Sequence, residues 1–230
     1  MSRWPIGRYL LANHTVFLTG VLIAVYLLTA VLVAVAALVT DVTVSGVDIT
    51  GQVLQWLAVA YGYSATALLS TVLTHGRTRR EFLVQHPVFQ IVTAGVLAAV
   101  VTGAYAVEAA VYRAAGWSRA LQDHRVFAVD DYPTIFLAYA SMLAIWMMTG
   151  AFLGAAFYRW QAAGAAALVP AAIVLTLSGG ANGFLSLPFA RLGLSSPPEI
   201  VVVTVVAVAA GWALLWATLR DVALRTRVPV

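Results

Sequence analysis

The chain has 230 residues, of which 62% are hydrophobic and 10% charged, and its mean hydropathy is +0.92. Soluble domains carry about 25% charged residues, so this composition indicates an integral membrane protein. All 13 basic residues are arginines, and the lack of lysine excludes a Walker A ATP site and Schiff-base catalysis in this chain. The lack of cysteine excludes thiolate chemistry, disulfides and cysteine metal sites. The net charge of +4 is modest, and its distribution does not indicate nucleic-acid binding.

Residues 1–15 combine two arginines and two aromatic rings with apolar side chains. This mixture predicts an N-terminal interfacial helix with its rings at headgroup depth. Residues 16–39 follow without a charge and would extend about 36 Å as a helix, enough to cross a ~30 Å bilayer core. Because the hydrophobic region of a secretory signal has only about 7–15 residues, we expect this first span to remain as an anchor.

Five further apolar segments predict five more transmembrane helices. A polar loop over 41–51 precedes the second span, and residues 113–134 form the longest polar connection. Before the sixth span, residues 179–198 are apolar but interrupted by glycine, serine and proline. The predicted fold class is all-α integral membrane, with residues 1–230 forming one six-helix transmembrane domain and no nucleotide-binding domain. The five segments are 52–73, 88–112, 135–158, 162–177 and 199–219.

The only strongly polar run in the first 110 residues lies at 74–83. Gly76 permits a sharp turn there, and Thr78 and Glu81 have the spacing of a capping box. Pro87 stands where a new helix could begin. We therefore predict a short basic helix over 75–86, between the second and third spans, with the arginines Arg77, Arg79 and Arg80.

Two interpretations of this basic helix remain open. Arginines at a membrane surface commonly act as topology signals that contact anionic lipid. The capping box, the turn glycine and an apolar face formed by Phe82 and Leu83 favour instead a docking helix that receives a partner protein.

The distribution of arginines predicts the orientation in the membrane. With six spans, nine arginines fall on the side that holds both termini and the basic helix, and four fall on the other side with most of the carboxylates. The positive-inside rule then places both termini and the basic helix in the cytoplasm.

Glu108 is the one carboxylate inside a predicted span, which makes it a candidate intramembrane polar site. Pairing with Arg113 or extension to the outer surface is the alternative reading. The four histidines are predicted at or beyond the membrane edges and lack ligand spacing, so no metal site is expected. Gly150 and Gly154 form a GxxxG step in an apolar helix, which is compatible with close helix packing.

The run Gly76-Arg77-Thr78-Arg79-Arg80-Glu81-Phe82 between spans two and three resembles that of permease subunits of type-2 ABC exporters. The likeness is closest to an actinobacterial multidrug and bacteriocin-immunity group. Gly150 and Gly154 followed by the basic turn at Arg159 agree with this family. The broken apolar stretch 179–198 also agrees, because the family places short re-entrant outer helices there.

This resemblance implies a transport subunit that is not itself an enzyme. Residues 75–86 would couple it to a separate cytoplasmic P-loop ATPase, two copies of which would bind ATP and Mg. A second permease subunit, identical or related, would complete the translocation path in the bacterial plasma membrane, in contact with membrane lipid. The chain lacks the long aromatic-lined outer loops of the polysaccharide exporters, which leaves hydrophobic drugs, peptides or lipids as candidate substrates.

The residues leave two other function classes open. A small-solute-binding subunit that docks on an energising module would need a dense cluster of polar or aromatic anchors. An intramembrane lipid-modifying enzyme would need facing reactive groups at membrane depth, and only Glu108 is a candidate.

Overall fold

The computed structural model describes residues 4–121, 126–181 and 197–222. Over these residues the protein is helical, with a single isolated β-bridge between Val44 and Ala120. The elements in order are α1 (Pro5–Leu10), a π-helical turn (Leu11–Thr15), α2 (Val16–Ala36), α3 (Gly46–Thr74), α4 (Arg79–Ala115), α5 (Tyr132–Trp160), a 3₁₀ helix (Gln161–Ala167), α6 (Leu168–Ala181) and α7 (Pro197–Leu219).

Five helical segments in the described part of the chain are long and apolar enough to cross a membrane. This confirms an all-helical protein suited to a bilayer, while the six-span layout is matched only in part. The five segments are α2, α3, α4, α7 and the run from α5 to Ser178.

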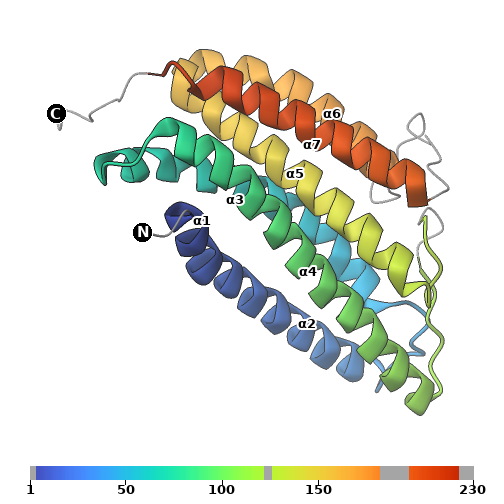
Figure 1. Cartoon of the computed structure of the whole chain (residues 1–230). Coiled ribbons are helices and arrows are strands. Elements are labelled where there is room, and N and C mark those ends of the chain that lie inside the picture. The colour runs from blue at the N-terminus through green and yellow to red at the C-terminus, as the bar shows by residue number, and fades with distance from the viewer. Residues whose placement is uncertain (1–3, 122–125, 182–196, 223–230) are drawn as a thin grey trace.

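The predicted fifth span, 162–177, is built from two pieces. The backbone reverses at Gln161, whose φ is 54°, and the 3₁₀ helix and α6 then return alongside α5 (Figure 1). The 3₁₀ helix rises about 14 Å and α6 about 21 Å, so neither piece alone matches a ~30 Å bilayer core. Most of the predicted re-entrant stretch 179–198 lies outside the described residues.

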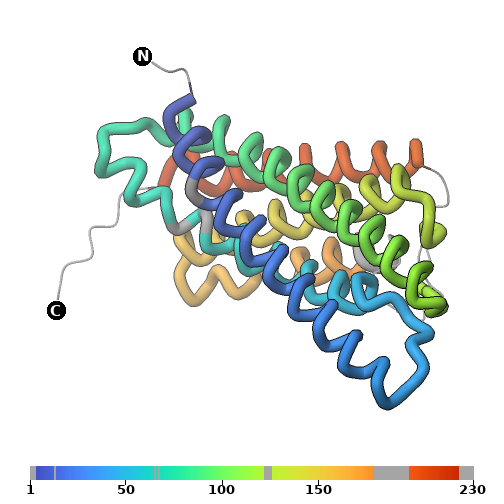
Figure 2. The backbone as a smooth tube through the Cα atoms, turned by 90° about the horizontal axis from the view of Figure 1, so that it is seen from below, coloured from blue at the N-terminus to red at the C-terminus, as the bar shows by residue number. Residues whose placement is uncertain are grey.

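Helix α5 is the centre of the bundle. It packs against α3, α4, α6 and α7, and 78% of the residues in its most apolar window are buried. The corresponding shares are 6% for α2 and 11% for α7. Figures 1 and 2 show α2 along one edge of the bundle, next to α4. Most of the apolar surface of α2 is therefore left for lipid or another chain.

The prediction that a new helix begins at Pro87 is wrong, because α4 runs without interruption from Arg79 to Ala115. Proline has no N–H, so the carbonyl of Leu83 one turn earlier loses its helical partner. The indole Nε1–H of Trp212 on α7 donates to this carbonyl oxygen at 2.9 Å. A hydrogen bond from a neighbouring helix thus replaces the missing one, and the basic helix and the third span form one rod.

The predicted loop 41–51 is also too long, because α3 begins at Gly46. Ser45 caps the helix by accepting from the Asp48 N–H at 3.0 Å. Before the cap, the chain pairs with the loop after α4: Ala120 N–H donates to Thr43 O (3.1 Å), and Ser45 N–H donates to Ala120 O (2.9 Å). Asp48 therefore lies inside the first turn of a helix and is buried.

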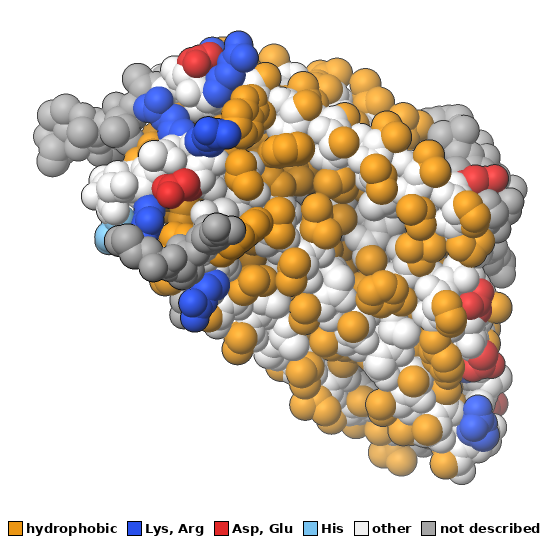
Figure 3. Space-filling view, viewed as in Figure 1, with side chains coloured by type: hydrophobic (Ala, Val, Ile, Leu, Met, Phe, Trp, Pro, Cys, Tyr) orange, Lys and Arg blue, Asp and Glu red, His pale blue; other side chains and the backbone are white. Residues whose placement is uncertain are grey.

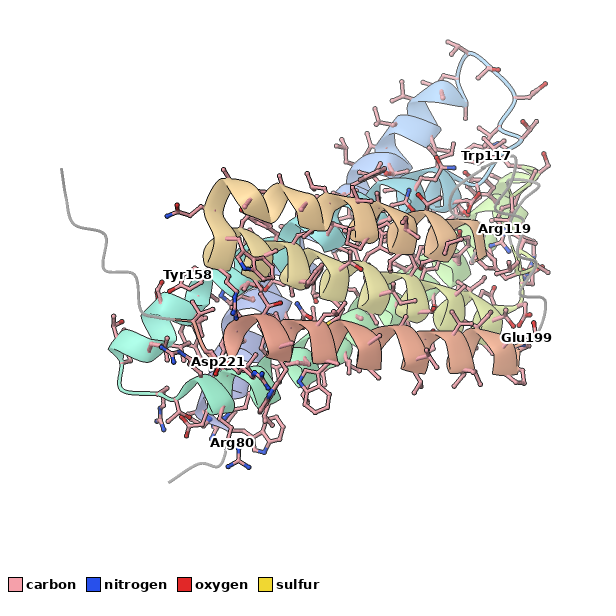
Figure 4. All side chains as sticks on the ribbon, turned by 90° about the horizontal axis from the view of Figure 1, so that it is seen from above. Arg80, Trp117, Arg119, Tyr158, Glu199 and Asp221 are labelled. Carbon is pink, nitrogen blue, oxygen red and sulfur yellow. The ribbon has the colours of Figure 1, made fainter. Side chains whose placement is uncertain are left out.

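Arginines are in excess at one end of the bundle and carboxylates at the other, with an apolar band between them (Figure 3). Glu81 and Asp221 lie among the arginines, and Arg113 and Arg119 lie at the end where carboxylates are in excess. Figure 4 labels Arg80, Tyr158 and Asp221 at one end, and Trp117, Arg119 and Glu199 at the other. We call the first the basic end and the second the acidic end. Among the described residues, the arginines of the basic end are Arg8, Arg77, Arg79, Arg80, Arg159 and Arg220, and the carboxylates of the acidic end are Asp41, Asp48, Glu108, Asp130, Asp131 and Glu199.

Candidate functional site

The turn between α3 and α4 has the local geometry that its residues predict. Gly76 has a φ of +73°, a conformation that favours glycine. Thr78 Oγ1 accepts from the Glu81 N–H (3.2 Å), and a Glu81 carboxylate oxygen accepts from the Thr78 N–H (3.0 Å). This reciprocal cap fixes the start of α4. Arg77 and Arg80 are exposed on it, whereas Arg79 is half-buried.

Phe82 and Leu83 do not form an exposed apolar face. They are 0% and 1% exposed and belong to a core cluster shared with α1, α3, α5 and α7. A partner protein at the basic end would therefore meet the polar side chains of the turn. Phe82 therefore packs the turn against the bundle, and its part in coupling stays a prediction.

A hollow of about 260 Å³ lies beside this turn, between α1 and the end of α3. It is open to the surface where His75 and Arg77 are exposed. Helix α1 is held over it because the Gly7 N–H donates to Gln85 Oε1 on α4 at 2.9 Å. We call it the basic-end hollow; its lining residues are Pro5, Ile6, Tyr9, Leu10, Leu68, Thr71, Val72, His75, Arg77 and Phe82.

At the acidic end, Glu108 is 8% exposed and its carboxylate meets the start of α3. It accepts from Ser45 Oγ at 2.6 Å and from the Val47 N–H at 3.0 Å. The N-terminus of α3 therefore lies directly against this carboxylate. The alternative of an ion pair with Arg113 is not what the structure shows, because Glu108 is bonded to α3 instead.

A second buried carboxylate, Asp48, extends this polar cluster into the bundle. It is 1% exposed and accepts from the Tyr105 hydroxyl at 3.0 Å. Tyr105 and Tyr139 share a further hydrogen bond of 3.2 Å between their hydroxyls. Asp48 is not among the predicted site residues, because the polar composition of 41–51 predicts a loop. The Ser45-x-x-Asp48 spacing, typical of a helix start, was the available signal.

Arg119 fastens the loop above this cluster and is not available to neutralise it. Its guanidinium donates to Tyr105 O (2.8 Å) and Val129 O (2.9 Å), and it forms an ion pair with Asp130. Its side chain is 8% exposed. We therefore assign Arg119 a structural role.

Next to Glu108 lies a groove of about 360 Å³ between α2 and the helices α3 and α4. We call it the α2–α4 groove. Its walls are mainly apolar, and its polar side chains are Glu108, the tyrosines Tyr26 and Tyr112, and Thr29. The remaining lining residues are Ile23, Leu27, Ala30, Val33, Ala34, Gly46, Val47, Val100, Ala104, Val107, Val111 and Trp117.

Gly150 and Gly154 lie where α5 meets α3, away from both ends. A Cβ at Gly150 would collide with the backbone oxygen of Val59, and one at Gly154 would stand 2.8 Å from Tyr63 O. A Cβ at Gly62 on α3 would likewise collide with the carbonyl oxygen of Met147. These glycines therefore allow two backbones to approach within the core of this chain.

Within the described residues, no three His, Asp or Glu side chains gather as a metal site. His86, which was predicted at a membrane edge, is 0% exposed with its ring stacked on Phe82 at 4.8 Å. His75 is exposed at the end of α3. The two histidines that flank the arginines thus occupy different environments.

Comparisons of this chain with protein families, with characterised proteins and with solved structures give no match. Its function is therefore argued from the basic turn, the buried carboxylates and the α2–α4 groove.

Proposed function

We propose that this chain is the membrane subunit of an ATP-driven exporter and that its basic end docks on a separate cytoplasmic ATPase. The observation that carries the proposal is the rigid α3–α4 turn, which presents the exposed guanidiniums of Arg77 and Arg80 beside the basic-end hollow. The reciprocal cap fixes the backbone at the start of α4, and a docking element that transmits force from a partner needs such a fixed backbone. The hollow offers room for an apolar side chain of the partner.

Helix α4 supplies a mechanical connection between this turn and the other side of the membrane. Its 37 residues extend about 55 Å, from the turn at the basic end to Glu108 and beyond at the acidic end. The Trp212–Leu83 hydrogen bond ties the start of this rod to α7. Movement of the turn by a partner would therefore reach the α2–α4 groove and α7 together.

The working exporter would contain two such chains, identical or related, and two ATPase subunits that bind ATP and Mg. The excess of arginines at the basic end supports a cytoplasmic location of that end in a bacterial plasma membrane. The exposed apolar surfaces of α2 and α7 are available for lipid or for the second membrane subunit.

The test is affinity purification from the native membrane with the pair Arg77→Glu and Arg80→Glu. We expect the unchanged chain to retain a P-loop ATPase at one copy per chain. The double variant should lose at least nine tenths of it, because the exposed positive surface of the turn is reversed. Arg220→Glu is the matched control, since Arg220 is an exposed arginine at the same end but outside the turn and hollow. Equal ATPase recovery in both variants would refute docking at the turn.

A small-solute-binding membrane subunit is the second candidate, and the α2–α4 groove is the observation that favours it. The two candidates differ in whether the chain acts on an ATPase. An energising exporter subunit stimulates ATP hydrolysis by its partner, whereas a binding subunit holds its ligand without one. An intramembrane enzyme is less favoured, because Ser45 beside Glu108 is 1% exposed and its oxygen already serves Glu108 and the Asp48 N–H.

A further inference from the structure

We infer that the α2–α4 groove is a binding site for a lipophilic cation, meaning a compact apolar molecule with one positive charge and no anionic group. Glu108 would hold the charge and the apolar walls would hold the body. The inference combines the volume of the groove, its composition, and the position of its one carboxylate.

The groove has the size and composition of a small-molecule site. Its volume of about 360 Å³ lies at the lower end of the range of roughly 300–1,000 Å³ found for ligand pockets. Such pockets are mainly apolar with a few placed polar groups. Here the polar groups are Glu108, Tyr26, Tyr112 and Thr29, so an apolar ligand would be oriented from one region of the wall.

Glu108 forms no ion pair within the described part of the chain. Its contacts are neutral: Ser45 Oγ and the Val47 N–H donate to it, one on each carboxylate oxygen, and the Tyr112 hydroxyl interacts with it as well. A carboxylate has about four lone-pair positions, so it can accept further bonds. A carboxylate in an apolar groove without a basic partner attracts a cation when it is ionised, because the apolar walls screen its charge poorly.

The lining also selects the kind of cation. It contains no arginine or histidine, so a phosphate or carboxylate on the ligand would have no positive side chain to meet. The zwitterionic headgroup of a phospholipid is therefore a poor fit, because its phosphate would lie close to Glu108. A molecule whose only charge is positive has no such conflict.

Access to the groove is from the bilayer. The α2 wall is mostly exposed, and Leu22 is the one buried residue among the described side chains of α2. Lipophilic cations concentrate in membranes, so a lateral entrance matches the place where such molecules accumulate. As a statement about the cargo of an exporter this inference rests on the proposed function, whereas binding itself does not.

The test is equilibrium dialysis with the purified full chain in phosphatidylcholine nanodiscs. Tetraphenylphosphonium is the probe, and tetraphenylborate is its matched anion of nearly the same size and shape. We expect saturable binding of the cation at one site per chain and at least tenfold weaker binding of the anion. Equal binding of both ions, or no saturable binding of the cation, would overturn the inference.

Variants identify the site. Glu108→Gln keeps the size of the side chain and should weaken cation binding at least tenfold, whereas Glu199→Gln, an exposed carboxylate at the same end, should leave it unchanged. Ala104→Phe fills the groove and should abolish binding, whereas Ala209→Phe places the same ring on the exposed side of α7. Unchanged affinity in both Glu108→Gln and Ala104→Phe would contradict the assignment.

Two further measurements close the alternatives. If Glu108→Gln does not fold, Glu108→Asp keeps the charge and should retain the preference for the cation over the anion; loss of that preference in a folded Glu108→Asp protein would count against the site. Nanodiscs with added phosphatidylethanolamine should bind the cation equally well, and competition by this lipid would show a lipid occupant instead. If the chain binds the cation but no ATPase is recovered with it, the exporter proposal is refuted and the binding site stands. If the ATPase is recovered but the cation does not bind, only the binding site is refuted.

Discussion

At the residue scale, Trp212 and Pro87 lie on different helices but are connected through one carbonyl group. Pro87 frees the oxygen of Leu83, and the Trp212 indole N–H bonds to it at 2.9 Å. The proline would otherwise leave an acceptor unsatisfied inside a bundle that excludes water. The contact explains how a proline remains inside a long helix next to its most basic turn.

We expect Trp212→Phe to destabilise the protein by about 1 kcal/mol, because the Leu83 carbonyl loses its donor. In a Pro87→Ala background the restored N–H can bond to that carbonyl, so Trp212→Phe should be nearly neutral there. Chemical unfolding of the four proteins in detergent gives the coupling energy. Trp216→Phe serves as the control for loss of an indole on the same helix. If Trp212→Phe lowers the free energy of unfolding equally in both backgrounds, Trp212 and Pro87 are not coupled through the Leu83 carbonyl.

Sequence reasoning at this scale succeeds where the partners are close in the chain. The Thr78–Glu81 cap joins residues three apart, so its pattern could be recognised directly. The partners of Glu108, at Ser45 and Val47, lie more than sixty positions away and include a backbone N–H that has no sequence signature. The sequence therefore predicts Glu108 as a candidate site but does not predict its hydrogen-bond partners.

At the element scale, the contact between α3 and α5 depends on glycine. Gly62, Gly150 and Gly154 each stand where a side chain would meet the backbone of the other helix. Close backbone approach maximises van der Waals contact, which drives helix association in lipid because apolar burial offers little there. The GxxxG step thus packs α5 on α3 within one chain.

Gly150→Ala should destabilise the protein by about 1–3 kcal/mol, since the added methyl group forces α3 and α5 apart. Gly95→Ala is the matched control, because nothing lies within 4 Å of a Cβ at that position of α4. Removing a helical glycine there should be neutral or stabilise by up to about 1 kcal/mol. Thermal unfolding in detergent compares the two, and equal effects would exclude a tight contact at Gly150.

Element boundaries were harder to predict than element existence. Hydropathy located the apolar segments, because a bilayer imposes a minimum length and a low charge on each. It misplaced the start of α3, because Asp48 is a buried carboxylate that a hydropathy average reads as loop. It also misread Pro87, because the compensating donor Trp212 lies on the last helix.

At the scale of the whole molecule, charge separation defines an orientation. The apolar band in Figure 3 lies between the basic end and the acidic end. The retention of arginine on the cytoplasmic side then predicts which end faces inward.

The chain has no cysteine, so single cysteines report accessibility without background. Thr43→Cys lies in the exposed loop before α3, and Thr74→Cys lies at the exposed end of α3. We expect a membrane-impermeant maleimide to label Thr43→Cys in intact cells and to label Thr74→Cys only after permeabilisation. The opposite pattern would invert the orientation and place the basic turn outside.

The loose attachment of α2 has a mechanical consequence. Among the described residues, Thr15 just before α2 bonds to Thr93 at 2.8 Å and Thr29 on α2 bonds to Thr50 at 2.9 Å, and these two hydroxyl pairs connect α2 to the bundle beside its apolar contacts. When the second pair separates, Thr29 still bonds to Val25 O and Thr50 to Gly46 O on their own helices.

Acyl chains can fill the space that α2 vacates, so parting the second pair costs on the order of 1 kcal/mol. Because Thr29 lines the α2–α4 groove, separation of this pair would widen the groove on the side that faces the bilayer.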